Sequence, residues 1–212
     1  MGLFNTFGTT KGSKQIKGLI KYFSLVDWWL TAFSDDERKR IIEVYRPMGS
    51  TESIIEGDII STSTNALNFL WCLAGWFNNK NDRTIAFKIL DKAKEFVNSS
   101  PILDVHFYYS AIIDIYYPER NNMPDAMRIA TDACLDQIKI APEAAKAFKE
   151  EYPGQDLPGH RGYEQLSIIR EKQKDFSGTI KICEQALTQG WGGNWQGRID
   201  RNNRKSLIKI SK

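Results

Sequence analysis

Small and apolar residues that recur at helical spacing restrict the possible folds of this chain more than any other feature. Between residues 64 and 190, apolar positions return with a helical period and are interrupted at Asn, Gly and Pro. In and around the stretch Gly162 to Gly190 this pattern predicts two short helices, of about residues 160–174 and 177–189. Two helices approach closely only where small side chains face each other, so we expect a helical hairpin here.

The same arrangement occurs twice upstream. One helix is predicted from about Thr64 to Phe77, and its partner follows the NNKN break. Another helix is predicted from about Leu103 to Tyr117, and its partner begins at Pro124, a residue favoured in a first helical turn. A short extra helix is expected from Pro142 to Tyr152. The sequence therefore predicts three helix pairs over residues 64–190.

The N-terminal part carries a separate helical pattern. Apolar residues recur from about Lys14 to Phe33, and Ser34-Asp-Asp-Glu37 has the form of a capping box, so a second helix should extend to about Arg46. Residues 1–48 are thus predicted to form a helical hairpin. Residues 49–63 show no clear period, and we expect them to be a connector.

The last 22 residues, 191–212, are predicted to be a capping segment with a basic tail. Trp191 and Trp195 follow the last hairpin, and we expect them to cover its exposed apolar end. The tail is either the solvated face of a terminal helix or a phosphate-binding segment. Its basic residues, set against the single acid Asp200, are Arg198, Arg201, Arg204, Lys205, Lys209 and Lys212.

A second basic cluster lies on the polar side of the first predicted helix. Such a helix either binds an anionic membrane surface or exposes its charges to solvent. Gly2 also fits the loose pattern for N-myristoylation, as an alternative to a frayed terminus. The cluster consists of Lys11, Lys14, Lys17 and Lys21.

Composition favours an ordinary soluble protein in the cytoplasm. The 29 Lys and Arg residues against 26 Asp and Glu give a net charge of +3, too small to indicate nucleic-acid binding from the total alone. The three cysteines Cys72, Cys134 and Cys183 lack zinc spacing and are expected to be buried reduced thiols. No apolar run is long enough for a bilayer, and the N-terminus lacks the features of a secretion signal.

The last predicted pair resembles the tetratricopeptide repeat. Leu166-Ser167 matches the Leu and small residue of the first helix, Phe176 the aromatic residue at the turn, and Ala186 the late small residue. This sequence departs from the family at three positions. Thr179 stands where the family usually has alanine, Arg170 where it has tyrosine, and Cys183 where it has an aromatic residue.

The upstream pairs match the same intervals, with Leu73-Ala74 set against Ala86 and Ala93, and Ile113-Asp114 set against Ala126 and Ala133. The resemblance implies an all-α fold in which residues 64–190 form a right-handed α-solenoid behind the extra N-terminal hairpin. It also implies that the first helices of the pairs line a concave surface for a peptide.

Candidate partner-binding residues follow from their positions in the resemblance. Amide, aromatic and arginine side chains make peptide contacts well, although Trp71 and Tyr108 could instead fill the core or the space between repeats. The candidates are Asn68, Trp71, Asn78, Asn79, Tyr108, Glu119, Arg161, Glu164, Glu171 and Lys172.

His106 and His160 are the only histidines, and each lies near the start of a predicted helix. His160 and Glu164 share one helical face, as a metal site or an acid and base pair would require. The two histidines are too few for a closed metal site, so structural roles at helix ends or between repeats are favoured. No phosphate loop, GxSxG or HExxH motif occurs.

The expected function is therefore a protein–protein interaction module, a scaffold or adaptor that binds a peptide or partner protein, with no catalytic residue, cofactor or metal. The alternative is a regulator that binds nucleic acid or a membrane surface through the N-terminal basic helix or the tail. A hydrolase built on His106 and His160 is the third hypothesis. The sequence is also compatible with a homo-oligomer.

Overall fold

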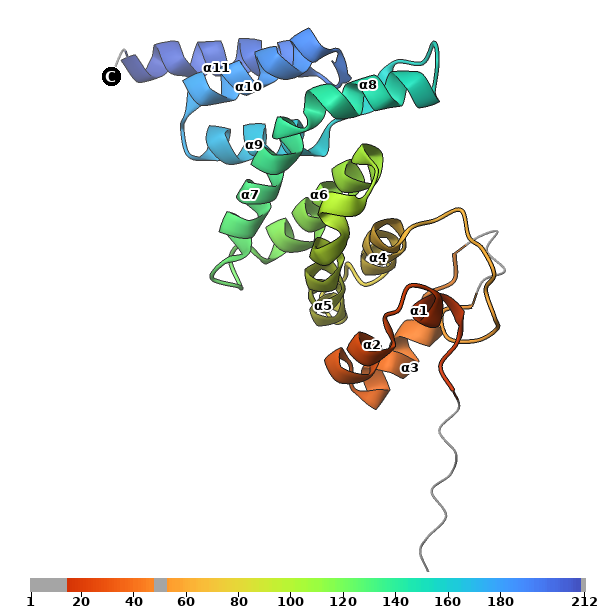
Figure 1. Ribbon diagram of the computed structural model, residues 1–212. Coiled ribbons are helices and arrows are strands. Elements are labelled where there is room, and N and C mark those ends of the chain that lie inside the picture. The colour runs from red at the N-terminus through yellow and green to blue at the C-terminus, as the bar shows by residue number, and fades with distance from the viewer. Residues whose placement is uncertain (1–14, 48–52, 211–212) are drawn as a thin grey trace, which may run out of the picture. The chain divides into compact units, whose positions relative to one another are not determined.

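The computed structural model of the protein describes residues 15–47 and 53–210, and it is mostly helical there (Figure 1). The expected all-α class is confirmed. The chain divides into two compact units, Met1–Ser63 and Thr64–Lys212. Among the described helices, none combines the length and the apolar character that a membrane span needs.

Three short helices form the first unit: α1 (Gly18–Tyr22), α2 (Val26–Ala32) and α3 (Asp35–Val44). The expectation of one helix up to Phe33 is wrong, because Ser24 adopts a left-handed φ of 58° and separates α1 from α2. The capping box is confirmed: the backbone N–H of Glu37 donates to Ser34 Oγ (3.3 Å), and that of Ser34 donates to Glu37 Oε2 (2.8 Å).

The expected connector belongs to the first unit. The backbone N–H groups at the start of α1 donate to carbonyls of residues 53–57, including Lys17 to Ile55 (2.9 Å) and Leu19 to Ser53 (3.1 Å). Gly18 has a φ of +58°, and a Cβ there would lie 2.3 Å from the Ser53 carbonyl oxygen. The free N–H groups of a helix N-terminus need acceptors, and this segment supplies them.

Predicted and observed helices of the second unit agree to within a few residues. They are α4 (Ala66–Gly75), α5 (Arg83–Ala93), the 3-10 helix η1 (Lys94–Ser99), α6 (Ile102–Tyr116), the 3-10 helix η2 (Tyr117–Glu119), α7 (Ala126–Lys139), α8 (Ala141–Glu151), α9 (Arg161–Lys172), α10 (Phe176–Gln189) and α11 (Trp195–Ile210). Two very short strands, β1 (Leu157–Gly159) and β2 (Trp191–Gly192), pair in parallel.

Helices that follow each other in the second unit pack as pairs, α4 with α5, α6 with α7 and α9 with α10. Neighbouring pairs also touch, because α6 packs on α4 and α9 packs on α7 (Figure 1). Fully buried apolar residues from each pair, such as Leu70, Ile113 and Ala186, make up the core. Burial of these faces is the main source of stability for such short helices.

One buried glutamine joins three of these helices. The side-chain amide of Gln137 on α7 donates to the carbonyl of His106 (2.8 Å) and to Ser110 Oγ (2.6 Å) on α6, and its oxygen accepts from the backbone N–H of Gly162 on α9 (2.6 Å). A Cβ at Gly162 would lie 2.8 Å from Gln137 Oε1 and 2.9 Å from the Cys134 carbonyl oxygen. The close approach of α9 to α7 therefore requires glycine at this position.

The C-terminal segment packs along the last pair. Helix α11 lies on α10 and buries Trp195 and Ile199. The Trp195 indole N–H donates to the Trp191 carbonyl oxygen (2.7 Å). Trp191 lies elsewhere than expected, because pairing of β2 with β1 places its ring against His160 (4.6 Å between ring centroids) and Phe148 (5.9 Å), rather than over the end of the last pair.

Candidate functional site

Several of the sequence-predicted partner-binding residues bond to the neighbouring helix. The Asn68 side chain on α4 donates to Asp104 Oδ1 on α6 (2.6 Å), and Asn65 donates to the other oxygen of the same carboxylate (2.5 Å). At the other end of α4, the Asn78 side chain donates to the Asp114 carbonyl oxygen (3.2 Å). These bonds fix α4 against α6. They also leave the Asn68 and Asn78 amides with fewer free donors for a partner.

A second set of polar contacts links the end of α6 to the helices beside it. Arg161 on α9 donates to Asp114 Oδ1 (2.5 Å), and Lys172 Nζ lies 3.2 Å from the Tyr117 hydroxyl. Glu119 is paired with Arg83 at the start of α5. Arg161, Lys172 and Glu119 therefore all hold one helix pair against the next.

Carboxylates of α9 neutralise part of the basic tail. Glu164 pairs with Arg198 (3.3 Å), and Glu171 pairs with Arg201 (2.8 Å) and Lys205 (2.6 Å). The hydrogen bond from Arg201 holds the pKa of Glu171 at about 2, against 4.5 for the free side chain, and Lys205 contributes in the same direction.

Two predicted residues do not lie on the first-helix face. Tyr108 is buried against α5, where its hydroxyl lies 3.4 Å from the Leu90 carbonyl oxygen, because its position on α6 points away from Phe107 and Asp114. Asn79 closes the turn between α4 and α5: its oxygen accepts from two backbone N–H groups, and its amide donates to Asp82 (2.9 Å).

Trp71 belongs to a row of aromatic side chains that crosses α4, α6 and α8. It stacks on Phe107 with 5.4 Å between ring centroids, Phe107 meets Phe148 edge to face at 5.9 Å, and Phe148 lies 6.5 Å from Tyr152. Phe107 is 38% exposed and Tyr152 is 45% exposed. We name these four residues the aromatic strip.

A hollow of about 280 Å³ lies beside the aromatic strip, lined by Phe107, Phe148, Tyr152 and the β1 segment. The residues at positions 107, 148 and 152 were not predicted as site residues. They lie in apolar helical patterns that are typical of core residues, and only the packing of α8 across α6 brings them together.

The two histidines are buried side by side with 5.0 Å between their ring centroids. His160 caps α9, since its Nδ1 accepts from the Tyr163 backbone N–H (3.3 Å), so the predicted role at a helix end is confirmed for His160. Burial lowers the pKa of His106 to about 4 and that of His160 to about 3. Glu164 bonds to Arg198 instead of His160.

No cluster of three metal-ligating side chains occurs in the described part of the chain. All three cysteines are free thiols, and burial raises the pKa of Cys72 to about 11 and that of Cys134 to about 12. Cys134 and Cys183 are buried as expected, while Cys72 is half-buried. Thiols with raised pKa values hold little thiolate near neutral pH, so these are poor nucleophiles.

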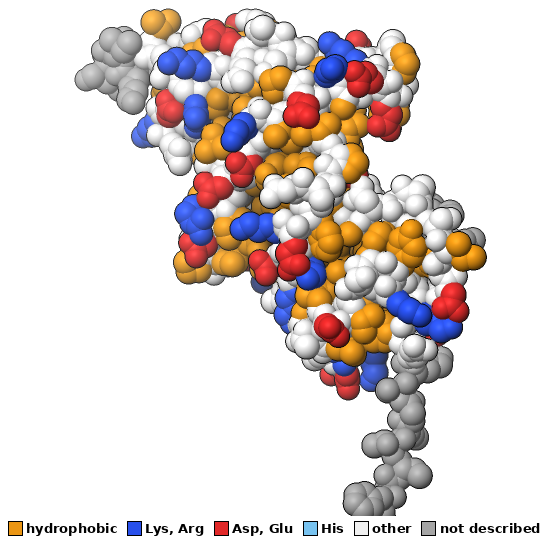
Figure 2. All heavy atoms as spheres, in the orientation of Figure 1, with side chains coloured by type: hydrophobic (Ala, Val, Ile, Leu, Met, Phe, Trp, Pro, Cys, Tyr) orange, Lys and Arg blue, Asp and Glu red, His pale blue; other side chains and the backbone are white. Residues whose placement is uncertain are grey.

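Charges of both signs alternate over the second unit in the view of Figure 2 and form no broad area of one sign on that face. In the first unit Lys17 pairs with Asp58 (2.6 Å), and Lys21 is exposed. Gly2, Lys11, Lys14 and Lys212 lie outside the described residues, as does the side chain of Lys209.

Comparison with known proteins gave no match. No family model matches the chain, and neither a curated protein nor a solved structure is significantly similar to it.

Proposed function

We propose that this protein is a protein–protein interaction module whose residues 64–190 form a short right-handed α-solenoid of the tetratricopeptide-like kind. Three successive helix pairs support this reading, and so does the close approach of α7 and α9 at Gly162. We propose that a peptide or partner protein binds on the face of α4, α6 and α8. The protein then acts as a scaffold or adaptor and has no catalytic residue or cofactor.

The observation that carries this proposal is the exposure of Phe107 and Tyr152 beside a hollow. Large aromatic side chains bury much apolar area when a partner covers them, and they are enriched among the residues that dominate binding energy. The hollow of about 280 Å³ between them could receive one side chain of a partner. In this proposal Trp71 is the base on which Phe107 stacks, beside the direct peptide contact expected of it from the sequence.

The electrostatic alternative receives less support. Arg198, Arg201 and Lys205 pair with carboxylates of α9, so only part of the charge of the tail remains for phosphate groups. A hydrolase built on the histidines also lacks support, because both imidazoles are buried among aromatic rings and their lowered pKa values make them weak bases.

The test is capture of partners from a lysate of the source cells with the wild-type protein and with the double variant Phe107→Ala, Tyr152→Ala. We expect partners that bind the wild-type protein in high salt to be lost with this variant, while circular dichroism shows an unchanged fold. The matched control is Leu135→Ala, Leu187→Ala, which removes apolar side chains of similar exposure (45% and 47%) from α7 and α10.

Equal loss in the control variant would contradict binding at the aromatic strip. Capture that disappears in high salt would instead support the electrostatic alternative.

A further inference from the structure

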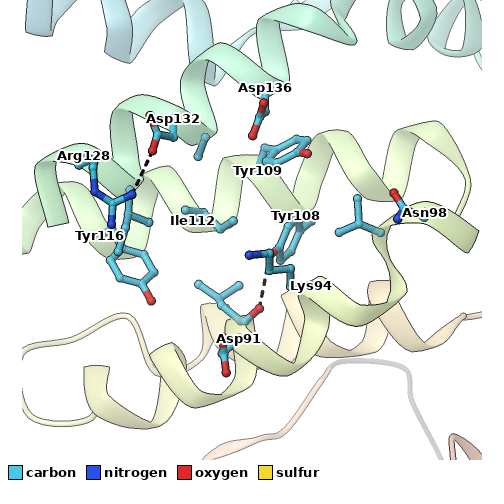
Figure 3. A pocket seen from close by; sticks show the side chains of 14 residues that line it. Asp91, Lys94, Asn98, Tyr108, Tyr109, Ile112, Tyr116, Arg128, Asp132 and Asp136 are labelled. Atoms are coloured by element: carbon cyan, nitrogen blue, oxygen red, sulfur yellow. Dashed lines mark hydrogen bonds and ion pairs between the residues drawn. The ribbon is translucent and has the colours of Figure 1, made fainter. Parts of the chain in front are cut away.

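A larger groove lies on the other side of α6 (Figure 3). Its volume is about 610 Å³; α6 forms the floor, α5 and η1 form one wall, and α7 forms the other. The floor carries Tyr108, Tyr109, Ile112 and Tyr116, whose spacing places them on one face of the helix. Phe107 lies on the opposite face of α6, so the groove and the aromatic strip are separate surfaces.

The walls of the groove carry more negative than positive charge. Asp91 projects from α5, and Asp132 and Asp136 project from α7, against the cations Lys94 and Arg128. Arg128 is held between Asp125 and Asp132, 3.3 Å from an oxygen of each. Within the described part of the chain, Asp91 and Asp136 form no ion pair. With Arg128 paired to Asp132, the charges left on the opposite walls are Asp91 and Asp136 against Lys94, an excess of one negative charge.

The tyrosines supply neutral aromatic rings rather than further charge. Burial raises the pKa of Tyr109 and of Tyr116, and the nearby carboxylates Asp136 and Asp91 raise them further. Both rings are half-buried, and Phe87 packs against Tyr116 with 4.6 Å between ring centroids, which limits the movement of that ring. A fixed aromatic ring beside a carboxylate attracts a cation through both the ring face and the negative charge.

We propose that this groove binds a basic segment of a partner protein by taking up an arginine side chain between Asp91 and Asp136, over the tyrosine floor. Arginine fits better than lysine because its planar guanidinium stacks on an aromatic ring while its N–H groups donate to carboxylates. The groove has room for residues beside the arginine as well as for the side chain itself. The absence of a metal cluster among the described residues argues against a metal ion here.

The experiment is a titration of the full chain with a fluorescent peptide of alternating arginine and serine, read by fluorescence anisotropy at low salt. The control peptide carries citrulline, which keeps the shape of arginine but is neutral. We expect the arginine peptide to bind and the citrulline peptide to bind at least about tenfold more weakly. Added salt should weaken the binding of the arginine peptide.

Variants locate the site. We expect Asp91→Asn, Asp136→Asn to weaken the arginine peptide about tenfold, because both side chains are exposed and their replacement leaves the packing intact. The matched control Glu143→Gln, Glu184→Gln removes the same charge from exposed positions on α8 and α10 and should bind like the wild type within about twofold. Phe107→Ala, Tyr152→Ala should also bind normally, which distinguishes this proposal from the proposed function.

Three outcomes would overturn the proposal. The first is no difference between the arginine and citrulline peptides, and the second is an equal effect of the two charge-removing variants. The third is displacement of the peptide by spermine at a concentration equal to that of the peptide, which would indicate a site for small cations.

Discussion

Gly162 determines how closely α9 can lie against α7. The Gln137 oxygen and the Cys134 carbonyl oxygen occupy the space where a methyl group would project, at 2.8 Å and 2.9 Å. The Gln137 oxygen is also held in place, because the amide of the same side chain bonds to two groups on α6. A larger residue at position 162 would therefore disturb all three helices, since a tightly packed interior relaxes only in part.

We predict that Gly162→Ala lowers the free energy of unfolding by about 1 to 3 kcal/mol, the usual cost of one extra methyl group in a packed interior. The matched control is Gly75→Ala at the end of α4, where a Cβ meets nothing within 4 Å. This control should leave stability unchanged or raise it by up to about 1 kcal/mol, because alanine favours a helix more than glycine does. Urea unfolding followed by circular dichroism measures both, and a stable Gly162→Ala protein would contradict the packing described here.

At the scale of elements, polar pairs join helices that are not neighbours in the sequence. Asn68 links α4 to Asp104 on α6, Arg161 links α9 to α6, and Glu171 links α9 to α11. The Glu171 side chain is only 15% exposed, while its partners Arg201 and Lys205 are 43% and 44% exposed. Solvent therefore screens these two ion pairs at the exposed cations and much less at the Glu171 carboxylate.

We predict that Glu171→Gln costs about 1 kcal/mol at pH 7, because two charged hydrogen bonds are weakened at a partly exposed position. The pKa of Glu171 is about 2 in the folded protein and 4.5 when unperturbed, so its contribution is complete above pH 4.5 and is lost as the pH falls toward 2. The wild type should thus lose more stability than Glu171→Gln between about pH 5 and about pH 3. Parallel pH profiles in urea unfolding would rule out this contribution, and Glu143→Gln on α8 is the control.

The helices of the second unit could be predicted from the sequence because helical periodicity is a local property. Their polar contacts could not, because Gln137 reaches partners 25 and 31 residues away and occupies a position that looks like a defect in an apolar pattern. The sequence also leaves open which face of α6 is buried, because apolar residues surround much of this helix, as Val105, Ile112 and Ile113 show. It therefore places Tyr108 on the wrong side of the helix. The break at Ser24 depends on a backbone angle that periodicity does not report.

At the scale of the whole molecule, the division between Ser63 and Thr64 separates units of unequal size. The second unit has its own core, and the first buries only a few large side chains, which include Leu19, Ile20, Trp29 and Ile41. The fraction of surface that a chain buries grows with its size, so the larger unit should be the more stable one.

We predict that a fragment of residues 64–212 folds by itself, with a single cooperative transition on heating and the helix content of that part of the full chain. Circular dichroism and a dispersed amide NMR spectrum check this expectation. Aggregation or gradual melting of the fragment would show that its core depends on residues 1–63. The isolated fragment of residues 1–63 should melt at a lower temperature.

The position of α11 limits how this architecture could grow. In a stack of helix pairs, each new pair is added to the exposed side of the last one, and here α11 already lies along α10 with Trp195 and Ile199 buried beneath it. A pair appended by gene fusion after α11 would find this face of α10 already covered. A longer member of this architecture would have to gain its pairs upstream of α9, or exchange α11 for a new pair.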